Sequence, residues 1–386
     1  MRIGSSSRFL IAPNAYKGGL HCFQVAQAIA EGIRRVLPRA LIEELPVADG
    51  GDCTLDVLVR ALGGQTFECR VTGPLGSPVI ARWGGLADER TAVIESAEAS
   101  GLRLVPSNRR DPWPATSFGT GELIAAALDR GYRRLIIGVG GTATVDGGAG
   151  LLQALGAALL DAQSHPIGVG GGALRALASL DFQRLDRRLR EAEILVACDV
   201  DNPICGPRGA APSFGPQKGA DPAMVRELDS NLERLIALLS DHVGRDLRLL
   251  PMGGAAGGMG AALLAAAAAH LQPGIDLILE LLNFDAHVSA CDLVITGEGT
   301  LDATSWGGKG PIGVAAAAHR RGVPCVAIVG QNDDVPGSQQ SGIFDTVISL
   351  VTADVPPEVA MRDAYPLLAR AAEQLARSLA LTRPSS

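Results

Sequence analysis

The sequence predicts an α/β protein with a parallel-sheet domain formed by both chain ends and a second α/β domain inserted between them. Short apolar runs alternate with amphipathic stretches of helical length, and glycine- and aspartate-rich loops join them. This strand–loop–helix pattern occupies the start of the chain and returns near Asp292, whereas the region from about Gln65 differs. We therefore expect one domain from residues 1–65 and 290–386, and an inserted domain from residues 66–289.

The first part of the parallel-sheet domain is expected to contain two strand–helix units. An apolar run before Pro13 has the length of a buried strand, and a helical pattern stops near Pro38. A second strand ends in the loop from Asp49 to Asp52. The predicted elements are strand 9–12, helix 24–36, strand 41–47 and helix 54–62.

The inserted domain is expected to begin with an antiparallel meander, because three short strand patterns are separated by Gly-Pro and Gly-Gly turns. The meander strands are predicted at 66–72, 78–84 and 91–96, followed by helix 121–129, strand 134–139, strand 194–198, helix 221–239 and a buried helix at 261–271. The first pattern then returns as strand 293–296, helix 312–320, strands 325–329 and 346–350, and helix 364–379.

Composition excludes several classes of protein. The chain has 386 residues, of which 47% are hydrophobic and 19% charged, so it can bury a core and is not intrinsically disordered. A net charge of −7 disfavours nucleic acid as a partner. The seven cysteines form no C-x-x-C pair, which favours reduced thiols and a cytoplasmic location. No signal peptide or membrane span is expected, and a homo-oligomer is compatible with the sequence.

Lysine is scarce, and its positions are informative. Lysine occurs in this sequence only at Lys17, Lys218 and Lys309, although the chain has 34 basic residues, and a glycine follows each one. A codon bias toward arginine explains the scarcity but not these positions. A compact ammonium group with three donors differs from a planar guanidinium, so we expect these lysines to contact phosphate, with at least two of them lining one site. The alternative is chance survival in solvated loops.

Acidic residues follow strand after strand. They occur at Asp49 and Asp52, Asp146, Asp199 and Asp201, and Glu298 and Asp302. Ligands of open α/β sheets bind at the carboxyl ends of strands. Lysines for a polyanion and carboxylates for a hard cation are the groups that phosphoryl transfer requires. Each acid taken singly is also compatible with capping a turn or a helix.

Two other classes of function stay open on the residues alone. The sequence contains no G-x-x-x-x-G-K-[ST] motif, so it is not a Walker-A protein. Gly308, Gly310 and Gly313 form a G-x-G-x-x-G pattern with Asp333 and Asp334 downstream, which is compatible with an NAD(P)-dependent oxidoreductase acting on a small hydroxy acid. A non-catalytic metabolite-binding regulator is the second alternative.

Long motifs in order resemble the bacterial glycerate kinase family along nearly the whole chain. The matching segments are Ala12-Pro-Asn-Ala-Tyr-Lys17-Gly18, Asp49-Gly-Gly-Asp52, Gly140-Gly-Thr-Ala-Thr144 with Asp146-Gly-Gly-Ala-Gly150, Ala197-Cys-Asp-Val-Asp-Asn-Pro203, Phe214-Gly-Pro-Gln-Lys-Gly-Ala220, Ala255-Ala-Gly-Gly-Met-Gly260 and Ile295-Thr-Gly-Glu-Gly299 with Asp302 and Gly308-Lys309. Four positions depart from the family pattern: Asn14 replaces an aspartate, Cys53 a glycine, Thr300 an arginine and Thr304 a glutamine. Loss of the arginine removes one expected anion contact.

The resemblance implies a flavodoxin-like domain from both chain ends and a restriction-endonuclease-like insert. It implies ATP-dependent phosphorylation of D-glycerate with Mg²⁺, giving 2-phosphoglycerate, with the 3-hydroxyl as the alternative acceptor. Lys17, Asp49 and Asp199 are then the expected catalytic residues, and Asp201 and Glu298 the expected metal ligands. The expected substrate- and ATP-binding residues are Asn14, Gly50, Gly51, Asp52, Gly140, Gly141, Thr142, Asp146, Lys218, Gly257, Gly258, Gly299 and Lys309.

Overall fold

A computed structural model describes residues 7–303, 305–307, 309–333 and 342–381. The chain divides into two compact units: a terminal unit, Met1–Asp49 with Ile275–Ser386, and an inserted unit, Gly50–Gly274. Both boundaries lie earlier in the chain than the expected 65/66 and 289/290. The reason is packing, because helix α2 (Thr54–Leu62) contacts strands of the inserted unit, and helix α10 (Phe284–Ser289) contacts a helix of the terminal unit.

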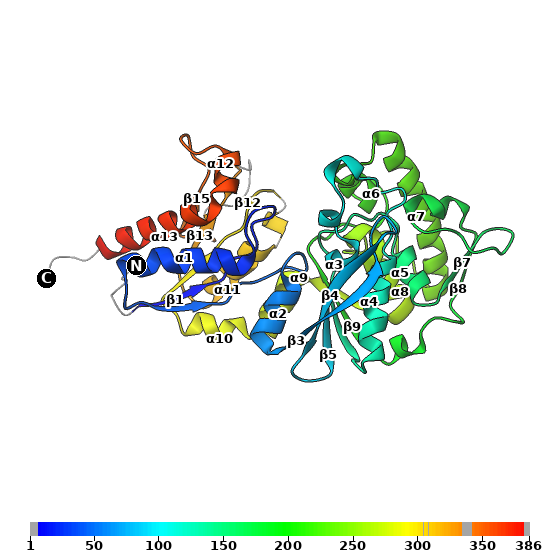
Figure 1. Ribbon diagram of the computed structural model, residues 1–386, viewed down its shortest axis with the longest axis horizontal. Coiled ribbons are helices and arrows are strands. Elements are labelled where there is room, and N and C mark those ends of the chain that lie inside the picture. The colour runs from blue at the N-terminus through cyan, green and yellow to red at the C-terminus, as the bar shows by residue number, and fades with distance from the viewer. Residues whose placement is uncertain (1–6, 304, 308, 334–341, 382–386) are drawn as a thin grey trace. The chain divides into compact units, whose positions relative to one another are not determined.

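The terminal unit contains a five-stranded sheet in the order β15-β13-β11-β1-β2, and all its neighbouring strands are parallel. Figure 1 shows that the blue start and the red end of the chain both belong to this unit. Its elements are β1 (Arg8–Ile11), α1 (Cys22–Val36), β2 (Leu41–Glu44), α9 (Gly274–Leu281), α10, β11 (Leu293–Thr296), β12 (Thr300–Leu301), α11 (Gly310–Arg320), β13 (Cys325–Val329), β14 (Gln331–Asn332), β15 (Thr346–Ser349), α12 (Pro357–Arg362) and α13 (Ala364–Leu381).

Helices α1 and α13 pack side by side and share one core with the sheet. Phe9 and Ile11 of β1 belong to this core. Leu10 between them is not part of this core but is also fully buried, as expected for a strand that is covered on both faces. The helices approach closely at Gly32, where a Cβ would collide with the Ala369 carbonyl oxygen. The amphipathic pattern of residues 24–36 predicted helix α1 because one face of this helix packs in the core.

The inserted unit contains a six-stranded mixed sheet in the order β10-β9-β6-β5-β4-β3. The pairs β3–β4 and β4–β5 are antiparallel, and the remaining pairs are parallel. Its elements are α2, β3 (Gly64–Thr72), β4 (Pro78–Leu86), β5 (Thr91–Glu95), α3 (Ser96–Ser100), α4 (Phe118–Asp129), β6 (Arg134–Gly138), α5 (Ala149–Ala154), β7 (Ala158–Leu160), β8 (Ser179–Asp181), β9 (Glu193–Cys198), α6 (Ala210–Phe214), α7 (Pro222–Val243), α8 (Met259–Ala267) and β10 (His270–Pro273). The predicted α/β class and the meander are confirmed.

One predicted element is wrong in its last four residues. The helix expected over residues 261–271 ends at Ala267, because Ala268 adopts a left-handed conformation with φ of 50°. Residues His270–Pro273 instead pair with Leu195–Cys198 of β9 as an edge strand. Pairing between distant segments has overridden the helix propensity of an alanine run. No helix in the described part of the chain is both long and apolar enough to cross a bilayer.

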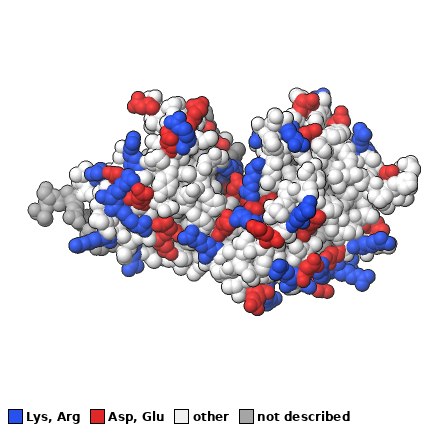
Figure 2. Space-filling view, viewed as in Figure 1, with Lys and Arg blue, Asp and Glu red and all other residues white. Residues whose placement is uncertain are grey.

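Charged side chains of both signs are interspersed over the face drawn in Figure 2. Among the described residues, many of these charges form short surface ion pairs, such as Arg248 with Asp246 at 2.7 Å and Arg321 with Asp285 at 2.8 Å. Such exposed pairs add little stability. The face shown therefore offers no broad basic field of the kind that binds a nucleic-acid backbone.

Candidate active site

The sheet of the terminal unit has a topological switch point between β1 and β11. From β1 the chain passes to β2 on one side, whereas the later strands β11, β13 and β15 extend on the other side. The loops after β1 and β11 therefore leave the sheet in different directions, and a crevice forms at their carboxyl ends. These loops carry Lys17 and Glu298.

A pocket of about 280 Å³ lies at this switch point. Lys17 comes from the loop after β1, Glu298 from the loop after β11, and Lys309 from the start of α11. Gly299 allows the two loops to approach, because a Cβ there would lie 3.3 Å from the Lys17 backbone nitrogen. Two of the three lysines of the sequence thus line one site. The full lining is Asn14, Ala15, Tyr16, Lys17, Gly19, Asp49, Glu298, Gly299, Thr300, Asp302, Ser305, Lys309, Gly330, Gln331, Val351, Pro357, Ala360, Met361 and Ala364.

Glu298 is an acid of this pocket in a strongly desolvating environment. Burial raises its pKa to about 7, a hydrogen bond with Ser305 opposes the rise, and the charge of Asp49 adds to it. The positive charges of Lys309 and Lys17 also lower its pKa. Its Oε1 atom is buried and has no hydrogen-bond partner among the described residues. A buried oxygen of this kind is an acceptor that a ligand or cation can satisfy.

Asn14 and Asp49 form a buried pair on the pocket wall. Asn14 Nδ2 donates to Asp49 Oδ2 at 3.0 Å, and Asn14 Oδ1 accepts from the Ala15 backbone N–H at 2.7 Å. Asp49 is only 4% exposed. Asn14 is the position at which the family pattern has an aspartate, and an aspartate could donate this hydrogen bond only when protonated. The amide therefore holds the carboxylate without competing for a proton.

Helix α11 points its first turn at the same wall. Lys309 is its N-cap, and Pro311 stands in its first turn. A Cβ at Gly310 would lie 2.8 Å from Asn14 Nδ2, so glycine is required for this approach. The N–H groups at a helix start attract anions, and a lysine there adds to the attraction.

The third lysine lies in the inserted unit and is buried. Lys218 is 4% exposed and donates to the Thr144 carbonyl oxygen at 2.7 Å and to Thr142 Oγ1 at 3.4 Å. Burial lowers its pKa to about 8, and the charges of Asp146 and Asp199 oppose this shift. Lys218 is therefore a buried amine beside acids rather than a solvated loop residue.

Asp146 is occupied by the chain itself. Its Oδ2 accepts from the Ser117 N–H and hydroxyl, both at 2.8 Å, and from the Gly150 N–H at 3.2 Å, while Oδ1 accepts from the Gly148 N–H at 3.1 Å. Burial raises its pKa, and these hydrogen bonds oppose the rise. Asp146 thus fixes the loop that precedes α5.

The glycines expected to admit a substrate also serve close packing of the backbone. A Cβ at Gly140 would lie 2.6 Å from Gly51 Cα and 3.2 Å from Asp199 Oδ2. The Gly140 N–H donates to the Gly50 carbonyl oxygen at 2.8 Å. Gly257 and Gly258 have φ values of 69° and 106°, and a Cβ at Gly257 would collide with the Thr144 carbonyl oxygen.

The two aspartates after β9 have different surroundings. The charge of Asp199 acts on Lys218, and its carboxylate lies beside Gly140. The Asp201 side chain is 79% exposed and forms an ion pair with Arg208 at 3.3 Å. Only Asp199 therefore lies with Lys218, and the metal role expected for Asp201 stays a prediction.

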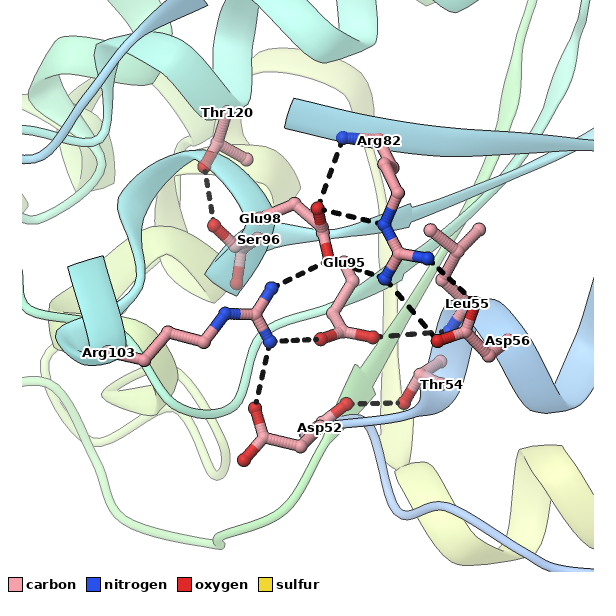
Figure 3. Close-up of polar contacts among 11 residues, drawn as sticks. Asp52, Thr54, Leu55, Asp56, Arg82, Glu95, Ser96, Glu98, Arg103 and Thr120 are labelled. Carbon is pink, nitrogen blue, oxygen red and sulfur yellow. Dashed lines mark hydrogen bonds and ion pairs between the residues drawn. The ribbon is translucent and has the colours of Figure 1, made fainter. Parts of the chain in front are cut away.

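A network of carboxylates and arginines reaches Asp52 at its edge (Figure 3). Arg103 Nη2 donates to Glu98 Oε1 at 2.6 Å, and Nη1 lies 3.5 Å from both Glu95 Oε1 and Asp52 Oδ1. Glu95 Oε2 accepts from the Leu55 N–H at 3.2 Å, at the start of α2.

Arg82 completes the network on its other side. It contacts Asp56 at 3.0 Å and Glu98 at 2.9 Å (Figure 3). Sequence reasoning missed Glu95, Glu98, Arg82 and Arg103. The available signal was an acid at the carboxyl end of an otherwise apolar strand, Thr91–Glu95, with a second acid one helical turn later.

Three residues named in the sequence analysis, Thr304, Gly308 and Asp334, lie outside the described residues. Of the G-x-G-x-x-G pattern, Gly310 begins α11 and Gly313 meets the Ile275 side chain.

A switch-point pocket suits a phosphorylated ligand when it combines two lysines, a helix start and an acid whose Oε1 has no partner in the described part of the chain. Such a site in an open α/β sheet is typical of phosphotransferases. Comparison with known proteins then makes the class specific: the profile of the Glycerate kinase family matches residues 9–380.

Individual relatives agree with the profile. A glycerate 2-kinase of Escherichia coli (strain K12) is 48% identical over 375 residues, which cover 97% of this chain and 98% of the relative. A glycerate kinase of Bacillus subtilis (strain 168) is 48% identical with the same coverage. A solved glycerate kinase structure from Salmonella typhimurium LT2 superposes with a TM-score of 0.82 at 45% identity, covering 97% of this chain and 99% of that one.

The chain therefore belongs to the glycerate kinase family. It is a phosphotransferase with an alcohol group as acceptor, and kinase membership implies ATP as the donor. This finding favours the phosphotransfer hypothesis over the oxidoreductase and regulator alternatives.

Proposed function

We propose that this protein transfers the γ-phosphoryl group of ATP to the 2-hydroxyl of D-glycerate, giving 2-phosphoglycerate and ADP. The observation that carries the proposal is the terminal-unit pocket, which Lys17 and Lys309 line together with Asp49 and Glu298. The name of the Escherichia coli relative supports the 2-position. Free thiols at all seven cysteines support a cytoplasmic reaction.

The reaction forms a bond between the acceptor oxygen and the γ-phosphorus, and it breaks the bond from that phosphorus to the β–γ bridging oxygen. The acceptor hydroxyl loses its proton to a carboxylate. Lys17 and Lys309 stabilise negative charge on the phosphoryl oxygens, where fixed donors are most effective. Asp49, held by Asn14, and Asp199, near Lys218, are the two candidate bases.

The residues of the pocket fit Mg²⁺, because Glu298 Oε1 is a buried carboxylate oxygen without a partner among the described residues. Glu298 would hold the ion in this pocket. Asp201, the other metal ligand expected from the sequence, belongs to the inserted unit. Mg²⁺ would neutralise charge on the phosphates when bound.

The remaining expected residues belong to substrate binding in this proposal. Asn14, Gly299 and Lys309 act in the terminal unit. In the inserted unit, Lys218 and Thr142 offer polar groups, and the glycine loops would let a ligand approach the backbone closely. The expected substrate- and ATP-binding residues of the inserted unit are Gly50, Gly51, Asp52, Gly140, Gly141, Thr142, Asp146, Lys218, Gly257 and Gly258.

Proton-coupled phosphorus NMR of the product tests both the reaction and the position. A phosphate on carbon 2 couples to one proton and gives a doublet, whereas a phosphate on carbon 3 couples to two protons and gives a triplet. We expect a doublet that requires ATP, Mg²⁺ and D-glycerate together. A triplet would establish the 3-kinase alternative, and ADP release that glycerate does not stimulate would remove glycerate as the acceptor.

A further inference from the structure

One wall of the terminal-unit pocket is apolar, and phosphate chemistry gives it no role. The wall comes from the segment after β15, from helix α12 and from the first residue of α13. Its residues are Val351, Pro357, Ala360, Met361 and Ala364. Lys17 and Lys309 line the same pocket from other loops, so one cavity offers both cationic and apolar groups.

The acceptor acid cannot use this wall. D-glycerate has three carbons, and each one bears an oxygen, so it offers almost no apolar surface. A cavity of about 280 Å³ is also larger than a three-carbon acid needs and lies close to the range of small-molecule sites, roughly 300–1,000 Å³. The other substrate of a kinase has an aromatic base with two apolar faces.

Met361 is the wall residue best suited to contact a planar ring. It is 58% exposed, although methionine is usually buried, and its flexible thioether adapts to aromatic surfaces. The loop after β1 lies against the same helix, because a Cβ at Gly19 would lie 3.8 Å from the Met361 carbonyl oxygen and 3.4 Å from that of Tyr16. The backbone of α12 at Met361 therefore stands beside the loop that carries Lys17, and both segments line the pocket.

The opposite requirement, a place for phosphates, is met at the start of α11. Eleven residues of regular helix begin at Gly310, and the lysine at its N-cap and Lys17 line the pocket. Glu298 lines the same pocket, and its Oε1, which no described residue satisfies, could bind a phosphate-bound cation. The pocket therefore offers charged groups for the phosphates and apolar groups for the base of one ligand.

We propose that the terminal-unit pocket binds ATP, with the adenine ring against the wall formed by Met361 and its neighbours and the phosphates beside Lys17 and Lys309. The inference rests on the proposed function, since it assigns one of the two kinase substrates to this pocket. It also makes Met361 a residue that selects a nucleotide over a bare polyphosphate.

The test compares Met361→Asp with Leu41→Asp in the full-length protein. Leu41 is a matched control because it is a 55% exposed apolar residue of the terminal unit that does not line the pocket. Titration calorimetry measures the affinities for MgADP and for inorganic tripolyphosphate, and steady-state kinetics measure KM for ATP and for D-glycerate. Met361→Gln repeats the measurement without a new charge, and Met361→Leu should restore the wild-type values.

We expect Met361→Asp to weaken MgADP binding and to raise KM for ATP about tenfold, which corresponds to the loss of one good contact. Tripolyphosphate affinity and KM for D-glycerate should stay within twofold of wild type, as should every value for Leu41→Asp. A rise in KM for D-glycerate with unchanged MgADP affinity would overturn the proposal, as would an equal loss of MgADP and tripolyphosphate affinity in Met361→Gln. The MgADP titration needs no glycerate, so it stays informative even if the wild-type protein makes no phosphoglycerate.

Discussion

The two charged clusters of this protein differ in how far their polar atoms are satisfied. In the terminal-unit pocket, Glu298 keeps a buried oxygen without a partner among the described residues. Around Asp52 in the inserted unit, Glu98 is bonded by two arginines, and Glu95 accepts from the Leu55 N–H. Buried polar groups are normally paired, so the first cluster is suited to receive a ligand and the second to hold a loop. We call the cluster in the terminal-unit pocket the open cluster and the network that reaches Asp52 the closed cluster. The predictions below test this contrast, from effects on turnover to effects on stability.

The lysines of the open cluster should not tolerate arginine. Lys17→Arg or Lys309→Arg should keep the fold but lower kcat by about 10²-fold or more, comparable to the loss of one preorganised donor. A planar guanidinium cannot replace a compact ammonium between glycine-rich loops. The measurement is steady-state turnover alongside melting curves, with the exposed Arg39→Lys as control. Wild-type rates in both lysine variants would show that these lysines survive by chance.

Substitutions at Asp199 and Asp201 should have different effects because the surroundings of the two side chains differ. If Asp199 is the base, Asp199→Asn should lower kcat by roughly 10²–10⁴-fold with no rescue by metal. If Asp201 holds metal, Asp201→Asn should raise the Mg²⁺ concentration needed for half activity, and excess Mg²⁺ should partly rescue it. Mg²⁺ titrations and melting curves on both variants decide. Loss of thermal stability without a catalytic defect would assign both residues a structural role.

Arg103 and Arg82 offer a matched pair within the closed cluster. Both contact Glu98, but only Arg103 also reaches Asp52 and Glu95 (Figure 3). Arg103→Gln should therefore change kcat or KM about tenfold, because it frees the Asp52 loop, and Arg103→Lys should restore part of the loss. Arg82→Gln should lower Tm with kinetics close to wild type. Equal kinetic effects of the two glutamine variants would reduce the network to general stabilisation.

The last prediction concerns the dependence of stability on pH. Burial raises the pKa of Glu95 from its usual 4.5 to about 8, with Arg103 lowering it and Asp52 and Glu98 raising it. Between these values the unfolded chain loses a proton that the folded protein keeps, so this residue makes stability fall as pH rises from about 4.5 to about 8.

Glu95→Gln should flatten this part of the stability profile. Urea unfolding between pH 5 and pH 8 measures the free energy of unfolding of the wild type and of the variant. The difference between the two values at each pH cancels the contributions of the other titratable groups. Arg82, also near the acid in Figure 3, stays charged throughout. Parallel profiles for the two proteins would show that Glu95 titrates normally in the fold.

The sequence by itself determined the local features. Apolar runs of strand length and amphipathic stretches of helical length predicted the α/β class, because both periodicities are properties of a short segment. The position of each lysine before a glycine predicted a shared site, and Lys17 and Lys309 do line one pocket. Long ordered motifs indicated the family that the comparisons show.

Tertiary structure alone decided what depends on contacts between distant segments. The end of α8 at Ala267 follows from the pairing of β10 with β9, which outweighs the local preference of alanine for helix. The closed network joins Asp52 to Glu95, Glu98 and Arg103 across loop, strand and helix, and no spacing in the sequence encodes those distances. Burial separated Asp199 from Asp201 although they are neighbours in sequence, because the environment of a side chain is set by the packing of the whole unit around it.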